Sequence, residues 1–168
     1  SRISSAKNEL IDHETFLSNT QLSAEKDAAI ESVIAQVYRE YQNRLTIANA
    51  FDFDDLIGST VALMQLFPEV ANMYRRRFRH IMVDEYQDTN HAQYMLIKEL
   101  VGTVAASADS PPPGELCVVG DADQSIYAFR GATIRNIEEF ERDYPNASTI
   151  LLEQNYRSTQ TILSAANA

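Results

Sequence analysis

Hydrophobic residues recur at helical spacing in the first part of the chain and gather into short runs in the later part. From Ala24 onward they lie three or four positions apart, which predicts an amphipathic helix with one apolar face. That face consists of Ile30, Val33, Ile34, Val37, Tyr38, Tyr41 and Leu45. We expect Tyr38 and Tyr41 to be core residues rather than a stacking platform, and residues 1–50 to form a helical segment that serves as scaffold.

Residues 51–57 then open a second helical region. Asp52 or Asp54 can cap the helix that follows, because a carboxylate accepts the free backbone N–H groups of a first turn and favours its positive end. That helix is expected to end at Pro68, which cannot continue it, and a shorter helix follows up to Phe78. Capping explains these aspartates without a metal ion.

Later apolar runs have the composition of buried strands, namely 81–83, 116–119 and 149–152. A helical pattern follows each run. The first begins with a capping box of Asn90 and Gln93 and stops at Gly102. The second carries Ile134, Ile137 and Phe140, and the third starts at Thr159. Strands that alternate with helices predict parallel pairing with right-handed crossovers, so the expected fold class is α/β, a parallel sheet with flanking helices.

Polar residues follow each predicted strand, at the edge where a parallel sheet binds its ligands. Asp84 and Glu85 come after the first run, Asp121 after the second and Glu153 after the third. Two adjacent carboxylates suit Mg²⁺, which takes oxygen ligands and keeps several waters. The second acid can orient or deprotonate an attacking water. The alternative is a solvated strand end, because Asp-Glu pairs are common in turns.

Amide and guanidinium groups lie in the later polar clusters. Gln124 has a donor and an acceptor, which suits it to bridging a terminal phosphate and an attacking water. Arg157 presents a fixed fork of donors that matches phosphate oxygens and can stabilise charge that develops on them. Tyr156, next to it in the sequence, can stack on a base. We therefore expect the three strand ends to converge on one rim of the sheet.

Two aromatic residues and a cation near Gln124 suggest contact with nucleic acid. Tyr127, Phe129 and Arg130 fall within four residues. Aromatic stacking contributes about 1–3 kcal/mol per base in single-strand binding and does not depend on sequence. Taken alone, however, these residues are better explained as core aromatics and a surface charge.

Composition narrows the class of protein. The 168 residues are 45% hydrophobic and 23% charged, as in a globular chain, and no apolar run reaches the roughly 18 residues of a membrane span. The net charge of −10 argues against a stand-alone electrostatic nucleic-acid binder. We interpret the basic run 75–79 as a solvated helix face. With one cysteine and no signal peptide, we expect a cytoplasmic protein that has no contact with a membrane.

Three long motifs carry a family resemblance. They are DEYQDTN from Asp84, VVGDADQSIYAFRGA from Val118 and LEQNYRS from Leu152. In this order and spacing they resemble motifs II, III and IV of the UvrD/PcrA/Rep-type superfamily 1 DNA helicases, and FDFDDLI resembles the segment before motif II. The resemblance implies that residues 51–168 are the later half of a RecA-like ATPase domain (1A). It also implies that residues 1–50 are the end of its inserted helical subdomain (1B).

The resemblance assigns roles to the polar residues of the strand ends. Asp84 and Glu85 match the Walker B pair at the Mg²⁺ ion, the first for the metal and the second for water activation. Gln124 and Arg157 match groups that contact the γ-phosphate of ATP, and Tyr156 matches one that packs near the adenine. The implied activity is ATP-dependent DNA unwinding with 3′→5′ polarity, in DNA repair or replication.

The DNA-binding residues are assigned in the same way. Tyr127, Phe129 and Arg130 match motif III residues that meet single-stranded DNA. Phe129 departs from many relatives, which carry Trp there, so stacking is expected to survive in weaker form. The implied partners are single-stranded DNA, junctions of single-stranded and double-stranded DNA, and the rest of the helicase chain.

The phosphate-binding loop of the family does not occur in this sequence. That loop, G-x-x-x-x-G-K-[ST], cradles the phosphates, and none of the five glycines here precedes a lysine. We therefore expect a piece of a larger helicase that is inactive alone and that could self-associate through an uncovered sheet edge. Two alternatives stay open: the motor part of a RecB- or AddA-like helicase–nuclease, and a non-catalytic protein-docking relative.

Overall fold

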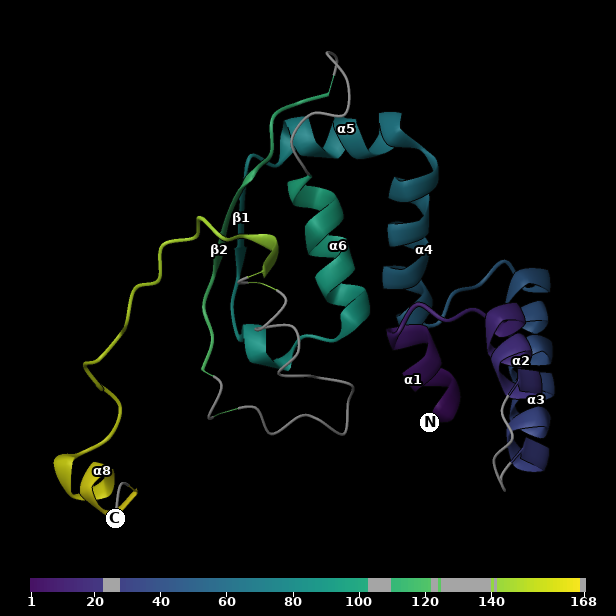
Figure 1. The fold of residues 1–168 in the computed structure, drawn as a ribbon, viewed down its shortest axis with the longest axis horizontal. Helices are drawn as coiled ribbons and strands as arrows, with labels where there is room; N and C mark the ends of the chain where they lie inside the picture. The colour runs from purple at the N-terminus through teal and green to yellow at the C-terminus, as the bar shows by residue number, and fades with distance from the viewer. Residues whose placement is uncertain (23–27, 103–109, 122–123, 125–139, 141, 167–168) are drawn as a thin grey trace.

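The fold combines a helical part with a small parallel sheet. The computed structural model describes residues 1–22, 28–102, 110–121, 124, 140 and 142–166 (Figure 1). The described elements are α1 (Arg2–Asn8), α2 (His13–Leu22), α3 (Ala28–Ile47), α4 (Phe53–Leu66), α5 (Pro68–Arg77), β1 (His80–Val83), the 3-10 turn η1 (Tyr86–Asp88), α6 (His91–Val101), β2 (Glu115–Val118) and α8 (Gln160–Ala166). The α/β class predicted from the sequence is confirmed, whereas a RecA-like architecture stays a prediction.

Helix α3 packs against α2 along only part of its apolar face. Tyr38 is buried, its hydroxyl donates to the carbonyl of Ile11 at 3.0 Å, and its ring meets Phe16 edge-on. Ile30 and Val33, by contrast, are 61% and 58% exposed. The prediction that Tyr38 is a core residue is confirmed, whereas the same prediction for Tyr41 was wrong, since Tyr41 is 39% exposed. Periodicity identifies residues that share a face, but it does not identify what covers them.

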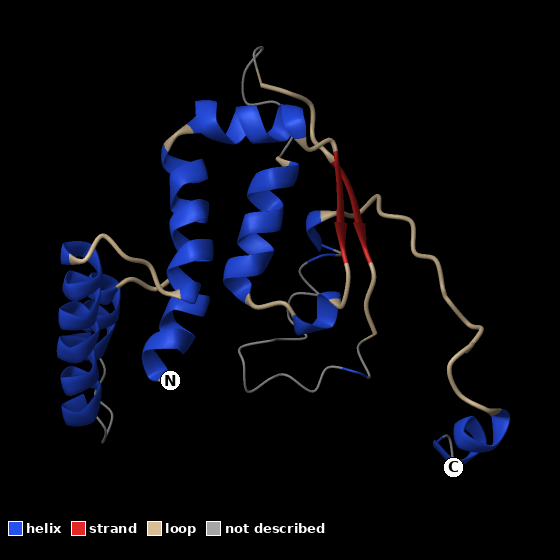
Figure 2. Ribbon diagram, turned by 180° about the vertical axis from the view of Figure 1, so that it is seen from behind, coloured by secondary structure: helices blue, strands red, loops and turns tan. Residues whose placement is uncertain are grey.

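Helices α4, α5 and α6 enclose a second core, in which α4 packs against both of the others (Figure 2). Asp52 caps α4 in a capping box: its carboxylate accepts from the Asp55 N–H at 2.8 Å, and the Asp55 carboxylate accepts from the Asp52 N–H at 3.3 Å. Asn90 and Gln93 make the same reciprocal pair at the start of α6, both at 2.9 Å. Both predicted caps are confirmed, with Asp52 rather than Asp54 in the first.

A buried lysine joins the N-terminal helices to this core. Lys7 of α1 is 6% exposed, and its Nζ donates to Asp52 at 2.7 Å and to Asp55 at 2.9 Å. Burial opposes the charge of Lys7, but the hydrogen bonds from its ammonium group to Asp52 and Asp55 outweigh burial and raise the pKa of Lys7. For Asp52 burial likewise opposes the charge, and the hydrogen bond from Lys7 leads the contacts that lower its pKa. Burial also raises the pKa of Tyr38, beside Lys7, to about 12.

The basic run 75–79, which begins in the last turn of α5, is only half solvated. Arg76 and Arg77 are exposed, as predicted. Arg75 instead donates through Nε to the carbonyl of Glu99 at 2.7 Å and pairs with the Glu99 carboxylate at 3.0 Å. Arg79 donates to the carbonyls of Pro112 and Pro113, at 2.6 and 2.7 Å. The interpretation of the entire run as a solvated face was therefore wrong, because two of its guanidinium groups hold α6 and the chain that enters β2.

Gly102, which ends α6, sits where a side chain is strained. Its φ of +76° is unfavourable for other residues, and an added Cβ would lie 3.0 Å from Arg75 Nε. We expect Gly102→Ala to destabilise the end of α6 by about 1–3 kcal/mol, seen as faster amide hydrogen exchange there in the full-length protein. Gly58→Ala is the matched control. Gly58 lies inside α4, and a Cβ there would meet the Leu10 side chain at an ordinary contact distance of 3.7 Å. Equal effects of both substitutions would contradict this prediction.

Strands β1 and β2 form a two-stranded parallel sheet. His80 lies opposite Glu115 and Val83 opposite Val118. One face of the sheet is open in the described residues, since Met82 is 79% exposed. Parallel strands require a crossover connection, and here it runs through η1 and α6.

The predicted third strand at 149–152 was wrong. Ile150, Leu151 and Leu152 are 77–82% exposed and form no regular element. This segment leaves the helices and the sheet and leads to α8 (Figure 1). A strand is stabilised by a backbone partner and by packing across its faces, and among the described residues this segment has neither. The helix predicted around Ile134 and Ile137 lies outside the described residues.

Candidate functional site

The C-terminal ends of β1 and β2 remain side by side beyond the strands. The Val119 N–H donates to the Val83 carbonyl at 2.8 Å, and the Tyr86 N–H donates to the Val119 carbonyl at 2.9 Å. These bonds extend the ladder into the polar residues that follow each strand. Asp84 and Glu85, which follow β1, therefore share one rim with Gly120 and Asp121, which follow β2, as the sequence predicts.

Glu85 adopts an unusual backbone conformation in the turn after β1. Its φ and ψ are 50° and 43°, in the left-handed region that non-glycine residues seldom occupy. The turn is held by the Asp88 N–H, which donates to the Glu85 carbonyl at 2.9 Å, and by the Glu85 N–H, which donates to Asp84 Oδ1 at 2.9 Å. Such strain persists only where surrounding contacts fix it, and it clusters at functional sites.

Gln87 belongs to this turn, and its side chain connects the turn to the end of β2. Its side chain is among the most buried in the protein, with 1% of the residue exposed. Its Nε2 donates to Glu85 Oε2 at 2.8 Å, and its Oε1 accepts from the Asp121 N–H at 3.0 Å. Gln87 was not predicted from the sequence as a site residue. A glutamine in a polar turn resembles a surface residue, and only the tertiary structure shows that it is buried.

Gln124 lies at the part of the rim that follows β2. Its Nε2 donates to Asp121 Oδ2 at 2.7 Å, and both residues are exposed. Gln124 is thus brought to the same rim as Asp84 and Glu85. Tyr127, Phe129 and Arg130 lie outside the described residues.

Tyr156 and Arg157 are not brought to this rim. Tyr156 is 92% exposed, and the N–H groups of Arg157 and Ser158 both donate to Asn155 Oδ1 at 2.9 Å, which makes a local turn. The turn follows the unpaired segment that runs away from the sheet (Figure 1). The expectation that all three polar clusters converge was therefore wrong for the third, because the strand that would position it does not form.

The two carboxylates fit a magnesium ion. Within the described residues there is no group of three or more His, Cys, Asp or Glu side chains that could hold a metal. Mg²⁺ does not require such a group, since it commonly binds through one or two carboxylates together with waters and phosphate oxygens. Asp84 and Glu85 are exposed at the rim, so both can meet an ion that arrives with a nucleotide.

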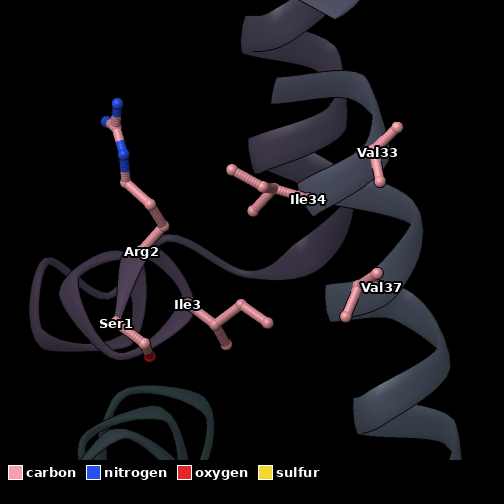
Figure 3. A pocket seen from close by; sticks show the side chains of 6 residues that line it. All are labelled: Ser1, Arg2, Ile3, Val33, Ile34 and Val37. Carbon is pink, nitrogen blue, oxygen red and sulfur yellow. The ribbon is translucent and has the colours of Figure 1, made fainter. Parts of the chain in front are cut away.

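Hollows elsewhere on the surface are not part of this site. One, of about 290 Å³, is lined mainly by Ile3 of α1 and by Val33, Ile34 and Val37 of α3 (Figure 3). Ile3 faces the α3 side chains across this hollow (Figure 3), and the surface that lines the hollow is almost entirely apolar. A second hollow, of about 320 Å³, lies among α1, α3 and α4 next to Lys7. Neither includes a strand end.

The fold and its acidic rim define an α/β protein with a candidate metal and nucleotide site where two parallel strands end. Residues 1–145 match the model of the UvrD/REP helicase N-terminal domain, and the chain belongs to this family. Within the described part of the chain, no helix is long and apolar enough to cross a membrane.

Named relatives are similar along the whole chain. It is 68% identical over 167 residues to ATP-dependent DNA helicase UvrD1 of Mycobacterium leprae (strain TN). The aligned region covers 99% of this chain and 21% of that protein. It is 53% identical over 165 residues to ATP-dependent DNA helicase PcrA of Bacillus subtilis (strain 168), covering 98% of this chain and 20% of the relative. The chain thus spans about a fifth of the length of the curated relatives it matches.

Proposed function

We propose that the protein containing this chain is an ATP-dependent DNA helicase that moves along single-stranded DNA with 3′→5′ polarity. In this proposal residues 51–168 belong to its RecA-like motor domain and residues 1–50 to a helical subdomain. The observation that carries the proposal is the shared rim, where the Asp84–Glu85 pair after β1 adjoins the segment with Gln124 after β2. The names of the relatives support it.

The carboxylates divide the chemistry of ATP hydrolysis between them. Asp84 holds Mg²⁺, directly or through water, with Glu85 beside it. When held there, the ion would supply positive charge that offsets the charge of the phosphates. Glu85 orients the attacking water and accepts its proton, and its left-handed backbone and the bond from Gln87 fix where its carboxylate lies.

Groups outside the acidic pair complete the proposed site. Gln124 contacts the γ-phosphate and the attacking water, and its bond to Asp121 holds it at the rim. Arg157 stabilises charge on the γ-phosphate and Tyr156 packs near the adenine. Both require segment 149–158 to reach the rim when the rest of the protein and the nucleotide are present. Tyr127, Phe129 and Arg130 contact single-stranded DNA by stacking and charge.

The proposed function is tested by ATP hydrolysis in the full-length protein. We expect single-stranded DNA to stimulate steady-state turnover strongly, and we expect residues 1–168 alone to show none. Strand separation should occur on a duplex with a 3′ single-stranded tail and not on one with a 5′ tail. A full-length protein that binds partner proteins but does not hydrolyse ATP with any DNA would contradict the proposal and favour a docking module.

A further inference from the structure

We propose that Gln87 is a positioning residue that holds the Glu85 carboxylate and links it to Asp121 and, through Asp121, to Gln124. The inference rests on the proposed function, because it concerns how the hydrolytic site is kept in register. The contacts form a continuous chain across the rim. Gln87 donates to Glu85 at 2.8 Å, accepts from the Asp121 N–H at 3.0 Å, and Asp121 accepts from Gln124 at 2.7 Å.

The two neighbours of Gln87 determine how its amide is oriented. A backbone N–H can only donate, so the atom that faces Asp121 must be the amide oxygen. A carboxylate accepts, so the atom that faces Glu85 must be the amide nitrogen. A side chain with one donor and one acceptor on adjacent atoms is therefore required. Glutamate would present an acceptor to an acceptor, and methionine would satisfy neither neighbour.

Burial makes this bridge sensitive to movement of either strand end. Gln87 is 1% exposed, so water cannot replace a partner that moves away. A buried polar group left without its hydrogen bond carries the full cost of desolvation. Glu85 and Asp121 consequently keep their spacing, and a shift of the segment with Gln124 is felt at Glu85.

Gly120 provides an independent observation on the same contact. A Cβ at this position would lie 2.8 Å from Gln87 Oε1, closer than real Cβ atoms come, and 3.3 Å from the Gln87 backbone nitrogen. The missing side chain lets the segment after β2 approach the amide closely enough for the Asp121 N–H to reach it. A glutamine that only filled space would not need a glycine opposite its oxygen.

The first experiment replaces Gln87 in the full-length protein and measures DNA-stimulated ATP hydrolysis. We expect Gln87→Met to lower kcat by about 10–100-fold, as loss of a residue that orients a ligand or base does, and to leave the KM for ATP nearly unchanged. Gln87→Glu keeps the acceptor for Asp121 and loses the donor to Glu85, so it should be at least as impaired. Full kcat in both variants would overturn the proposal.

The second experiment approaches the contact from Gly120. We expect Gly120→Ala to lower kcat because its methyl group displaces the Gln87 amide. In a Gln87→Ala background the clash with the Gln87 amide is gone and only the 3.3 Å contacts with the backbone nitrogen of residue 87 and with Tyr86 Cβ remain, so the double variant should match Gln87→Ala within about threefold. Losses that multiply in the double variant would show that the two residues act separately and would overturn the proposal, even if Gln87→Met fails to fold.

Thr89→Val is the matched control in the same buried turn. It removes the bond from the Thr89 hydroxyl to the Tyr86 carbonyl, at 2.7 Å, and leaves the bridge intact. We expect a lower melting temperature with kcat near that of the wild type, and a loss of kcat equal to that of Gln87→Met would make Gln87 merely structural. An inactive wild-type protein would refute the proposed function itself, whereas an active wild type with active Gln87 variants refutes only this inference.

Discussion

Glu85→Gln in the full-length protein should lower the kcat of DNA-stimulated ATP hydrolysis by about 10²-fold or more, the usual contribution of a positioned general base. The amide has nearly the shape of the carboxylate. In the wild type Gln87 Nε2 donates to Glu85 Oε2 at 2.8 Å, and the amide oxygen of the variant can accept the same bond. The turn should therefore remain intact and nucleotide binding should persist. The measurement is steady-state turnover with saturating single-stranded DNA, beside the affinity for ATP.

Glu115→Gln is the control at the opposite end of the same sheet. Glu115 begins β2, is exposed, and pairs with His80 Nδ1 at 2.8 Å. An exposed pair of this kind contributes little, so kcat should change by less than about twofold. If Glu85→Gln hydrolysed ATP as fast as the control, Glu85 would not be the base, and the docking alternative would become the better account of the rim.

Features set by neighbouring residues were predictable from the sequence. The capping pairs at Asp52 and Asn90, the end of α6 at Gly102 and the acidic end of β1 each depend on a few consecutive side chains, and all are confirmed. Within the site, the shared rim of Asp84–Glu85 and Gln124 also follows from two apolar runs that pair in parallel.

Features set by distant contacts were not predictable in the same way. An apolar run such as 149–152 specifies a strand only if another strand lies beside it, and none does in the described residues. The position of Arg157 depends on that pairing, so it was missed as well. Gln87 was missed because of a distant contact that does form: the segment that lies against it is more than thirty positions away in the sequence. Sequence patterns identify which chemistry is present more readily than where it is assembled.

Lys7→Met should destabilise the junction of α1 and α4 by about 3 kcal/mol, since removing one partner of a buried ion pair leaves the other charge uncompensated. Asp52 and Asp55 would then face each other without the ammonium group that lies 2.7 and 2.9 Å from them. Amide hydrogen exchange in α1 and in the first turn of α4 reports this locally within the full-length protein. A loss of about 3 kcal/mol corresponds to roughly 10²-fold faster exchange there.

The pKa shifts set the pH range over which the wild-type junction is stable. The pKa of Asp52 lies below its ordinary 3.8 in the folded protein, so its contribution to stability is complete above that value and is lost as pH falls through the lowered pKa. The pKa of Lys7 lies above its ordinary 10.5, so its contribution to stability is complete below that value and is lost as pH rises through the raised pKa. Exchange protection, corrected for intrinsic rates, should therefore be constant between these limits.

Arg44→Met separates the effect of burial from that of charge. Arg44 also pairs with a carboxylate, Glu40 at 2.8 Å, but the two side chains are 77% and 60% exposed. Solvent screens such a pair, and its loss should cost less than about 0.5 kcal/mol. Equal exchange rates in the Lys7 and Arg44 variants would mean that the Lys7 cluster is no stronger than a surface pair. The attachment of α1 would then depend on its apolar contacts alone, and protection would fall with loss of Ile3 rather than of Lys7.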